Sequence, residues 1–199
     1  MLVATHNPGK VREFALLMRA LHADLVGLTE LGILAQVQET GSTFAENALI
    51  KARAYAALSG QTTLADDSGL EVDALEGRPG VLSARYAGPT ASDLDRNILL
   101  LRELESVPAS ARTARFRCAL AVAWPDGRCI LTTGTCEGEI AFEPRGANGF
   151  GYDPIFYIPA LGFTMAELPP EAKNELSHRA RAARALLHAL QTCARGWPL

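Results

Sequence analysis

The chain has 199 residues, of which 48% are hydrophobic and 21% charged, and its formal net charge at pH 7 is −3. This composition excludes intrinsic disorder, and the length fits a single domain over residues 1–199. Lys and Arg are spread along the sequence, which argues against a surface that binds a nucleic-acid polymer. No apolar run reaches membrane-spanning length, so we expect no membrane partner.

Hydrophobic periodicity predicts helices and strands in alternation along the first half of the chain. Thr43 and Glu46 have the spacing of a capping box, which assigns Glu46 to the start of a helix. The expected elements are a strand at 1–5, a helix at 8–21, a strand at 25–28, a helix from 43 to about 58, a strand at 62–65, a turn at 66–69, extended chain at 70–75 and a helix at about 92–105.

The second half is richer in strands. Two long β-like runs at 114–124 and 128–142 are separated by a Pro-Asp-Gly turn, and a further strand is expected at 155–158. A last helix begins near Ser177. Because hairpin-connected strands are mixed with strand–helix alternation, the sequence predicts an α/β protein with a mixed central sheet flanked by helices.

Four cysteines show no C-x-x-C pair and no zinc-ligand spacing; they are Cys118, Cys129, Cys136 and Cys193. Each lies in apolar or strand-like sequence, where a reduced cysteine behaves as a small hydrophobic residue. Residues 1–5 fit a core strand better than a signal peptide. We therefore expect a cytoplasmic protein.

The segment Thr5-His6-Asn7-Pro8-Gly9-Lys10 connects the first strand to the first helix. Asn7 suits the N-cap, and Pro8 suits the first helical position. The free N–H groups there, with the charge of Lys10, can face an anion. The spacing is not that of a Walker loop, since Ala4 and Val11 stand where Gly and a hydroxyl are needed. A plain strand-to-helix turn explains the segment equally well.

The last helix begins in a similar way, because His178 and Arg179 follow a Ser that suits the N-cap. Cations in the first turn oppose the helix dipole by roughly 0.3–1 kcal/mol each when exposed, and a bound anion would reverse that sign. Lys173 lies just upstream. Two helix starts that carry cations indicate a shared polyanionic ligand, for which phosphates are the obvious candidates.

Asp66 and Asp67 are expected at the end of a strand, where α/β sheets place ligands. Adjacent acids before Ser-Gly also suit an ordinary turn. Beside bound phosphates they would be oxygen ligands for Mg²⁺, which prefers one or two carboxylates together with substrate phosphates. Glu39, in a loop, is a second candidate ligand. Lys51 either reaches the phosphates or is a solvated helix lysine, and spacing alone does not decide.

The loop at 149–154 places Phe150 and Tyr152 among glycines, which permit close approach of the backbone. An exposed ring there can stack on a purine while backbone groups hydrogen-bond the edge of the base. The alternative is a tight loop whose two aromatic side chains fill the core.

Together these segments resemble the inosine triphosphate pyrophosphatase family, which removes non-standard purine nucleotides. They follow the family's order over essentially the whole chain: THNPGK, ETGSTFAENALIKA, LADDSGLEVDAL, GVLSARYAG, ANGFGYDPIF and KNELSHRA. The resemblance implies Mg²⁺-dependent cleavage of ITP, dITP or XTP to the nucleoside monophosphate and pyrophosphate. It also implies a homodimer whose elongated α/β fold has a cleft between two lobes.

The resemblance assigns roles to individual residues. Asp67 matches the family's proposed general base and metal ligand, and Asp66 is the alternative base. The residues that match substrate contacts are Thr5, His6, Asn7, Pro8, Gly9, Lys10 and Lys51 at the phosphates, Ser68 beside Asp67, Phe150, Gly151, Tyr152 and Asp153 in the base-binding loop, and Lys173, His178 and Arg179 as the remaining contacts.

One position departs from the family pattern. The family often has a metal-binding Glu three residues before the Gly that matches Gly41, but here that residue is Gln38. Either Glu39 takes its place or the metal rests mainly on Asp67. Two other functions use the same anion-binding features: a nucleotide-binding sensor without turnover, and a γ-phosphate hydrolase that releases orthophosphate.

Overall fold

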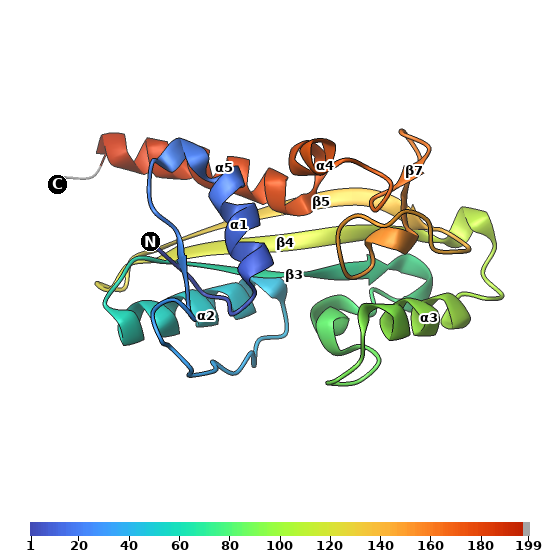
Figure 1. Ribbon diagram of the computed structural model, residues 1–199, viewed down its shortest axis with the longest axis horizontal. Coiled ribbons are helices and arrows are strands. Elements are labelled where there is room, and N and C mark those ends of the chain that lie inside the picture. The colour runs from blue at the N-terminus through green and yellow to red at the C-terminus, as the bar shows by residue number, and fades with distance from the viewer. Residues whose placement is uncertain (197–199) are drawn as a thin grey trace. The chain divides into compact units, whose positions relative to one another are not determined.

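A computed structural model describes residues 1–196, with side chains described up to residue 192. Within these residues the strands form a seven-stranded sheet in the order β2-β1-β3-β4-β5-β6-β7 (Figure 1). β1 pairs in parallel with β2 and β3, whereas β6 pairs antiparallel with β5 and β7. The sheet is therefore mixed, and the predicted α/β class is confirmed.

The strands are β1 Leu2–Val3, β2 Val26–Gly27, β3 Thr63–Val72, β4 Thr113–Ala123, β5 Cys129–Ile140, β6 Phe156–Ile158 and β7 Phe163–Thr164. The α-helices are α1 Pro8–Leu17, α2 Phe44–Ser59, α3 Asp93–Glu103, α4 Pro170–Leu176 and α5 His178–Gly196. Short 3₁₀ helices cover Arg19–Leu21, Asp73–Leu75, Gly80–Arg85, Ala109–Ala111 and Asp153–Ile155.

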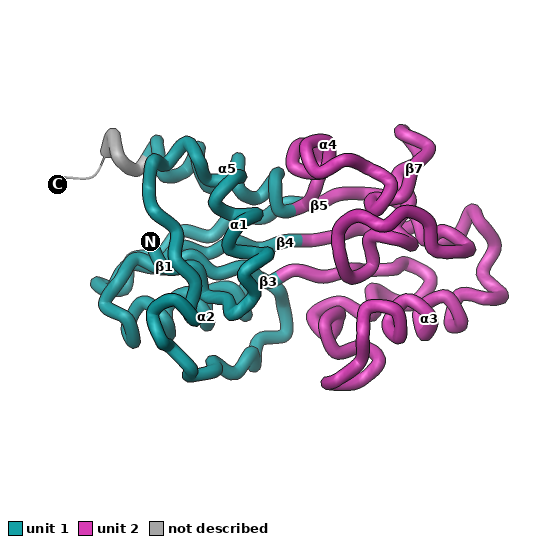
Figure 2. The backbone as a smooth tube through the Cα atoms, in the orientation of Figure 1, with its two compact units in different colours: residues 1–67, 118–134, 179–199 teal, residues 68–117, 135–178 magenta. Residues whose placement is uncertain are grey.

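The chain divides into two compact units (Figure 2). Unit 1 contains residues 1–67, 118–134 and 179–199, and unit 2 contains residues 68–117 and 135–178. Each unit has its own apolar core. In unit 1, Val3 and Leu64 pack with Phe14 of α1 and Leu186 of α5. In unit 2, residues of β3, α3, β4, β5 and β6 form a second cluster.

Local signals at the helix starts predict the structure well. The side chain of Asn7 accepts hydrogen bonds from Gly9 and Lys10 at the start of α1. Thr43 and Glu46 form the expected capping box at the start of α2. The first helix is shorter than predicted, because it ends at Leu17 and a 3₁₀ turn follows.

The predicted turn at residues 66–69 is wrong, because β3 runs without interruption from Thr63 to Val72. Residues 63–67 are all buried, and the pairing and burial of a strand outweigh the turn preference of Asp, Ser and Gly. Extended chain was also expected through Leu75, but Asp73–Leu75 forms a 3₁₀ helix. The acids therefore lie within a strand and not in a turn beyond its end.

Candidate functional site

The strand geometry of β3 separates the two adjacent acids. Successive side chains of a strand point to opposite faces of the sheet. Asp66 contacts α1 and α5 through Lys10 and Arg179, whereas Asp67 contacts Lys51 of α2. In unit 1, α1 and α5 lie on one side of the sheet and α2 on the other (Figure 1). The two carboxylates consequently have different ion-pair partners.

Asp66 is a buried carboxylate that forms ion pairs with two cationic side chains. Lys10 Nζ lies 3.0 and 2.9 Å from its two oxygens, and Arg179 Nε lies 3.6 Å from Oδ2. Burial alone would raise the pKa of Asp66, but the positive charges of Lys10, Arg179 and Lys51 lower it well below its usual range. Asp66 is thus ionised and fully engaged. Glu13 provides Arg179 with a second carboxylate at 3.7 Å.

Asp67 is only partly engaged. Its Oδ1 accepts a hydrogen bond from Lys51 Nζ at 3.2 Å, but its buried Oδ2 has no hydrogen-bond partner. Burial raises the pKa of Asp67 and the charge of Glu39 adds to this, although Lys51 and the amide of Asn47 act in the opposite direction. A carboxylate with a raised pKa and a free oxygen is suited to accept a proton.

Lys51 connects Asp67 to Glu39. Its Nζ lies 2.7 Å from Glu39 Oε1, so one ammonium group joins both acids. Burial would lower the pKa of Lys51, but Asp66, Asp67 and Glu39 together raise it. The structure therefore places Glu39 beside the acidic strand. Lys51 is a partly buried member of this group, paired with two carboxylates, and not a solvated helix lysine.

A pocket of about 270 Å³ lies where the short strands β1 and β2 end and β3 continues. It combines the first segment predicted to bind anions with the charged residues of β3, α2 and the loop before α2. Its lining residues are Ala4, Thr5, His6, Lys10, Leu28, Gln36, Val37, Glu39, Lys51, Tyr55 and Asp66. Asn7, Pro8 and Gly9 form the adjoining start of α1.

The predicted metal ligands Asp67 and Glu39 lie near one cation, but the described residues do not form a complete metal site. Among the described residues, no group of three or more His, Cys, Asp or Glu side chains has the arrangement of a metal site. Asp67 and Glu39 nevertheless converge on one cation, the ammonium of Lys51. Two carboxylates with a free, buried Asp67 oxygen match the donor set of Mg²⁺, which takes its remaining ligands from phosphates and water.

In unit 2, the aromatic loop is held from several sides. The N–H of Gly151 donates to Asp93 at 2.7 Å, and the carbonyl of Gly151 accepts from Asn97 at 3.1 Å. The N–H of Phe150 donates to Asp153, which Lys173 also contacts at 2.5 Å. These two backbone N–H groups are therefore already bonded to carboxylates of the same unit.

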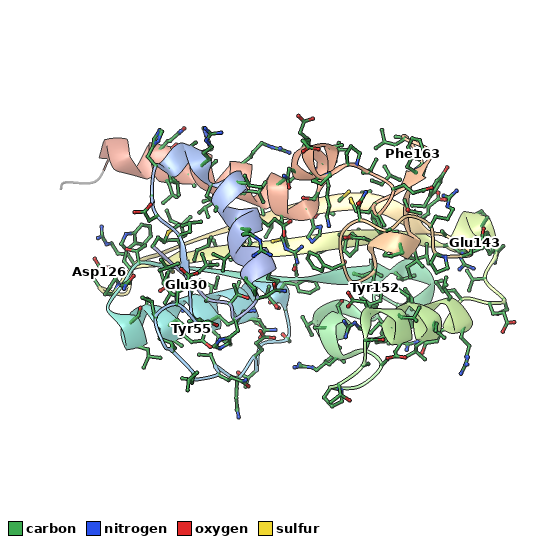
Figure 3. The ribbon with its side chains drawn as sticks, viewed as in Figure 1. Glu30, Tyr55, Asp126, Glu143, Tyr152 and Phe163 are labelled. Carbon is green, nitrogen blue, oxygen red and sulfur yellow. The ribbon has the colours of Figure 1, made fainter. Side chains whose placement is uncertain are left out.

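The two aromatic residues of this loop have different environments. Tyr152, labelled in Figure 3, is 4% exposed, and its hydroxyl donates to the carbonyl of Ser83 at 2.9 Å. Phe150 is 44% exposed, and the ammonium of Lys173 lies 4.8 Å from its ring centre. Tyr152 therefore fills the core, whereas Phe150 presents a ring that can stack on a ligand.

The remaining predicted residues lie near the start of α5 and in β3. Lys173 lies in α4, a helix that the sequence did not predict. His178 is buried and its ring stacks on Phe116, with the ring centres 4.8 Å apart. Ser68 lies in the half of β3 that belongs to unit 2. Arg179 is buried and paired with protein carboxylates, so its position does not by itself require a bound anion.

Sequence reasoning missed several residues that build these sites. Glu13 and Asp93 carried no signal, because each acts through a partner distant in sequence. Asn47 could have been noticed as a polar residue among the apolar positions of α2 that face the core. Of the cysteines whose side chains are described, Cys118, Cys129 and Cys136 form no disulfide, and the side chain of Cys193 lies outside the described residues. No described helix is long and apolar enough to span a membrane.

The chain is similar to several known proteins over most of its length. The model of the Ham1 family matches residues 1–189. A protein of Geobacillus kaustophilus named dITP/XTP pyrophosphatase is 54% identical over 182 residues, which cover 92% of this chain and 89% of the relative. A protein of the same name from Nitratidesulfovibrio vulgaris is 51% identical over 193 residues, or 94% of this chain and 93% of the relative.

Solved structures show the same fold. The Staphylococcus aureus Ham1 protein has a TM-score of 0.87 and 43% identity, covering 96% of this chain and 97% of its own. A HAM1 protein from Coxiella burnetii has a TM-score of 0.88 and 45% identity, covering 96% and 98%. The resemblance found in the sequence is confirmed by these matches.

Proposed function

The chain belongs to the Ham1 family, and we propose that it hydrolyses non-standard purine nucleoside triphosphates such as ITP, dITP and XTP to the nucleoside monophosphate and pyrophosphate. The names of its relatives, which are dITP/XTP pyrophosphatases, support this substrate class and this reaction. The structural observation that carries the proposal is the state of Asp67: it is buried, it is paired with Lys51, which also pairs with Glu39, and one of its oxygens has no hydrogen bond.

Asp67 is our candidate for the general base. Its free oxygen accepts a proton from a water molecule, whose oxygen attacks the α-phosphorus as the bond to the bridging oxygen of the β-phosphate breaks. The raised pKa of Asp67 favours this role. Asp66 is a poor alternative, because Lys10 and Arg179 occupy its oxygens and keep its pKa low. We assign to Asp66 the task of holding these two cations.

Asp67 and Glu39 are the residues that would hold Mg²⁺. The fit rests on the convergence of both carboxylates on one cation, the Lys51 ammonium. When bound, the ion neutralises charge on phosphate oxygens in the transition state. This assignment gives the metal-binding role to Glu39, the neighbour of Gln38, which stands where the family often has its metal-binding Glu.

Lys10 and Lys51 are our candidates for stabilising the pyrophosphate as it leaves. Both ammonium groups border the pocket of unit 1, and the start of α1 adds backbone N–H groups beside them. Preorganised positive charge of this kind acts on the charge that develops in the transition state. Phe150 is the candidate for stacking on the purine, because its ring is exposed while Tyr152 is buried.

Discrimination against ATP is expected at the 6-position of the purine. ITP, dITP and XTP carry an oxygen there, whereas ATP carries an amino group that would leave a buried donor of the protein unpaired, at a cost of roughly 1–3 kcal/mol. The measurement is kcat/KM for ITP, XTP, GTP and ATP. Equal values for ITP and ATP would remove this part of the proposal.

One product assay tests the reaction. Purified enzyme with Mg²⁺ and ITP is expected to release pyrophosphate and IMP in equal amounts, with no orthophosphate when inorganic pyrophosphatase is absent. Release of orthophosphate with IDP would identify a γ-phosphate hydrolase. Tight binding of ITP without any product would identify a nucleotide sensor. Either of the last two results contradicts the proposal.

We further propose that the enzyme is a homodimer that acts in the cytoplasm, as the resemblance and the reduced cysteines suggest. Size-exclusion chromatography with light scattering is expected to give twice the mass of one chain. A monomer at micromolar concentration with full activity would contradict the dimer.

A further inference from the structure

Helix α2 carries a polar residue on its buried face. Asn47 is 1% exposed and lies among Phe44, Ala48 and Ala52, which are also buried. Burying an amide without hydrogen bonds is costly, so a polar residue at such a position needs a local reason. The two ends of the Asn47 amide supply one, because they face two different parts of the site in unit 1.

The oxygen of the amide anchors the loop that carries Glu39. Asn47 Oδ1 accepts a hydrogen bond from the N–H of Gly41 at 2.8 Å. The loop is pressed against the start of α2 here: a Cβ on Gly41 would lie 2.6 Å from Glu46 Cβ and 2.8 Å from Asn47 Oδ1. Only glycine allows this approach. Because Gly41 is two residues after Glu39, the anchor fixes the position from which Glu39 reaches Lys51.

The nitrogen of the same amide faces the acidic strand. Asn47 Nδ2 and Asp67 Oδ2 are both fully buried, and neither has a hydrogen bond of normal geometry. The amide nevertheless lies close enough to Asp67 to lower the pKa of its carboxyl group. An amide is planar, so once its oxygen is bound to Gly41 the direction of its nitrogen is fixed. A donor is thus held next to the carboxyl group of the candidate base.

We propose that Asn47 is a positioning residue that joins the Glu39 loop to Asp67 and so sets the geometry of the two carboxylates that would hold Mg²⁺. This inference rests on the proposed function, which it deepens. Asn47 acts through Gly41 and Asp67 and need not touch the nucleotide. Residues that orient metal ligands in this way typically change metal affinity or activity 10–100-fold when they are replaced.

The test compares Asn47→Ala with Gly41→Ala, which disturbs the same contact from the loop side. Both are expected to raise the Mg²⁺ concentration for half-maximal ITP hydrolysis 10–100-fold, while KM for ITP at saturating Mg²⁺ changes less than about threefold, because the nucleotide contacts remain. Calorimetry of Mg²⁺ binding in the presence of α,β-methylene-ITP is expected to show the same loss of affinity without turnover.

Asn47→Asp separates the two ends of the amide. It keeps an oxygen for Gly41 but replaces the N–H₂ group beside Asp67, so a reduced kcat is expected. Wild-type kcat in this variant would overturn the contact with Asp67, and wild-type Mg²⁺ affinity in both Asn47→Ala and Gly41→Ala would overturn the whole inference.

Thr43→Ala is the matched control, because it removes the cap of the same helix without touching Asn47 or Gly41. It should lower the thermal midpoint and leave Mg²⁺ affinity unchanged. An equal loss of Mg²⁺ affinity in Thr43→Ala would show that Asn47 acts only through the stability of α2. A wild-type enzyme that releases no pyrophosphate from ITP would instead contradict the proposed function.

Discussion

The two units of this protein differ in how completely their buried carboxylates are hydrogen-bonded. In unit 2, Asp153 is enclosed by the Phe150 N–H and by Lys173, and Gly151 is bonded at both ends of its peptide groups. In unit 1, Asp67 keeps a buried oxygen without a partner. A fully hydrogen-bonded group is rigid. A buried acceptor without a hydrogen bond raises the free energy of the folded state, so its presence needs a reason other than folding.

This difference suggests a division of labour within the proposed reaction. The acids of unit 1 are our candidates for the chemistry, so their replacement should lower kcat. Phe150, in the rigid loop of unit 2, is our candidate for recognition of the base, so its replacement should raise KM and leave kcat in place. The same contrast exists within unit 1. Asp66 is paired with two cationic side chains, whereas one oxygen of its neighbour Asp67 has no hydrogen bond.

The largest effect is expected for Asp67→Asn, which keeps the shape of the side chain and removes the base. Loss of general-base catalysis should lower kcat for ITP roughly 10²- to 10⁴-fold. The control is Asp126→Asn, in the exposed turn between β4 and β5 of the same unit (Figure 3). If Asp67→Asn hydrolyses ITP at a near wild-type rate, the contrast between the two units fails.

The pH dependence of kcat is a second test of Asp67 as the general base. Burial and the charge of Glu39 raise the pKa of Asp67 above its ordinary 3.8. A base must be deprotonated to act, so kcat should fall as pH falls through a pKa higher than 3.8. A kcat profile that stays flat down to pH 4 would show that no carboxylate with a raised pKa serves as the base.

Asp66→Asn should instead reduce stability. It leaves Lys10 and the buried Arg179 without their shared carboxylate, and breaking a buried ion pair from one side costs about 3 kcal/mol. The folded pKa of Asp66 is lowered, so its contribution is present above the unfolded pKa near 3.8 and is lost as pH falls below that value. Urea unfolding should therefore show a large difference from wild type at pH 7 that shrinks below pH 4.

How far the sequence alone could predict this site depends on whether each signal is local. Asn7 and Thr43 cap their helices through neighbours two or three residues away, and both were predicted correctly. The stretch from Asp66 to Gly69 was predicted as a turn because its residues favour turns, but β3 is buried and pairs with β1, which is distant in sequence, and these tertiary contacts keep the stretch within a strand. Without that strand, the separation of Asp66 and Asp67 onto two faces could not be foreseen.

For unit 2, Phe150→Ala is expected to raise KM for ITP about tenfold, since stacking of a base on an aromatic ring contributes roughly 1–3 kcal/mol. The value of kcat should change little. Phe142→Ala is the matched control, because Phe142 is 64% exposed in the same unit and lies outside the loop. Equal effects of the two substitutions on KM would show that Phe150 has no special part in recognition.

The smallest effect is expected for Tyr152→Phe, and it decides between two interpretations of the same loop. The resemblance places Tyr152 among the substrate contacts, but the structure buries its ring and directs its hydroxyl to the carbonyl of Ser83. Loss of this hydrogen bond should reduce stability by about 1 kcal/mol in urea unfolding. Both kcat and KM for ITP should stay within twofold of wild type. A clear rise in KM would mean that Tyr152 contacts the nucleotide, and the rigid loop of unit 2 would then present two rings and not one.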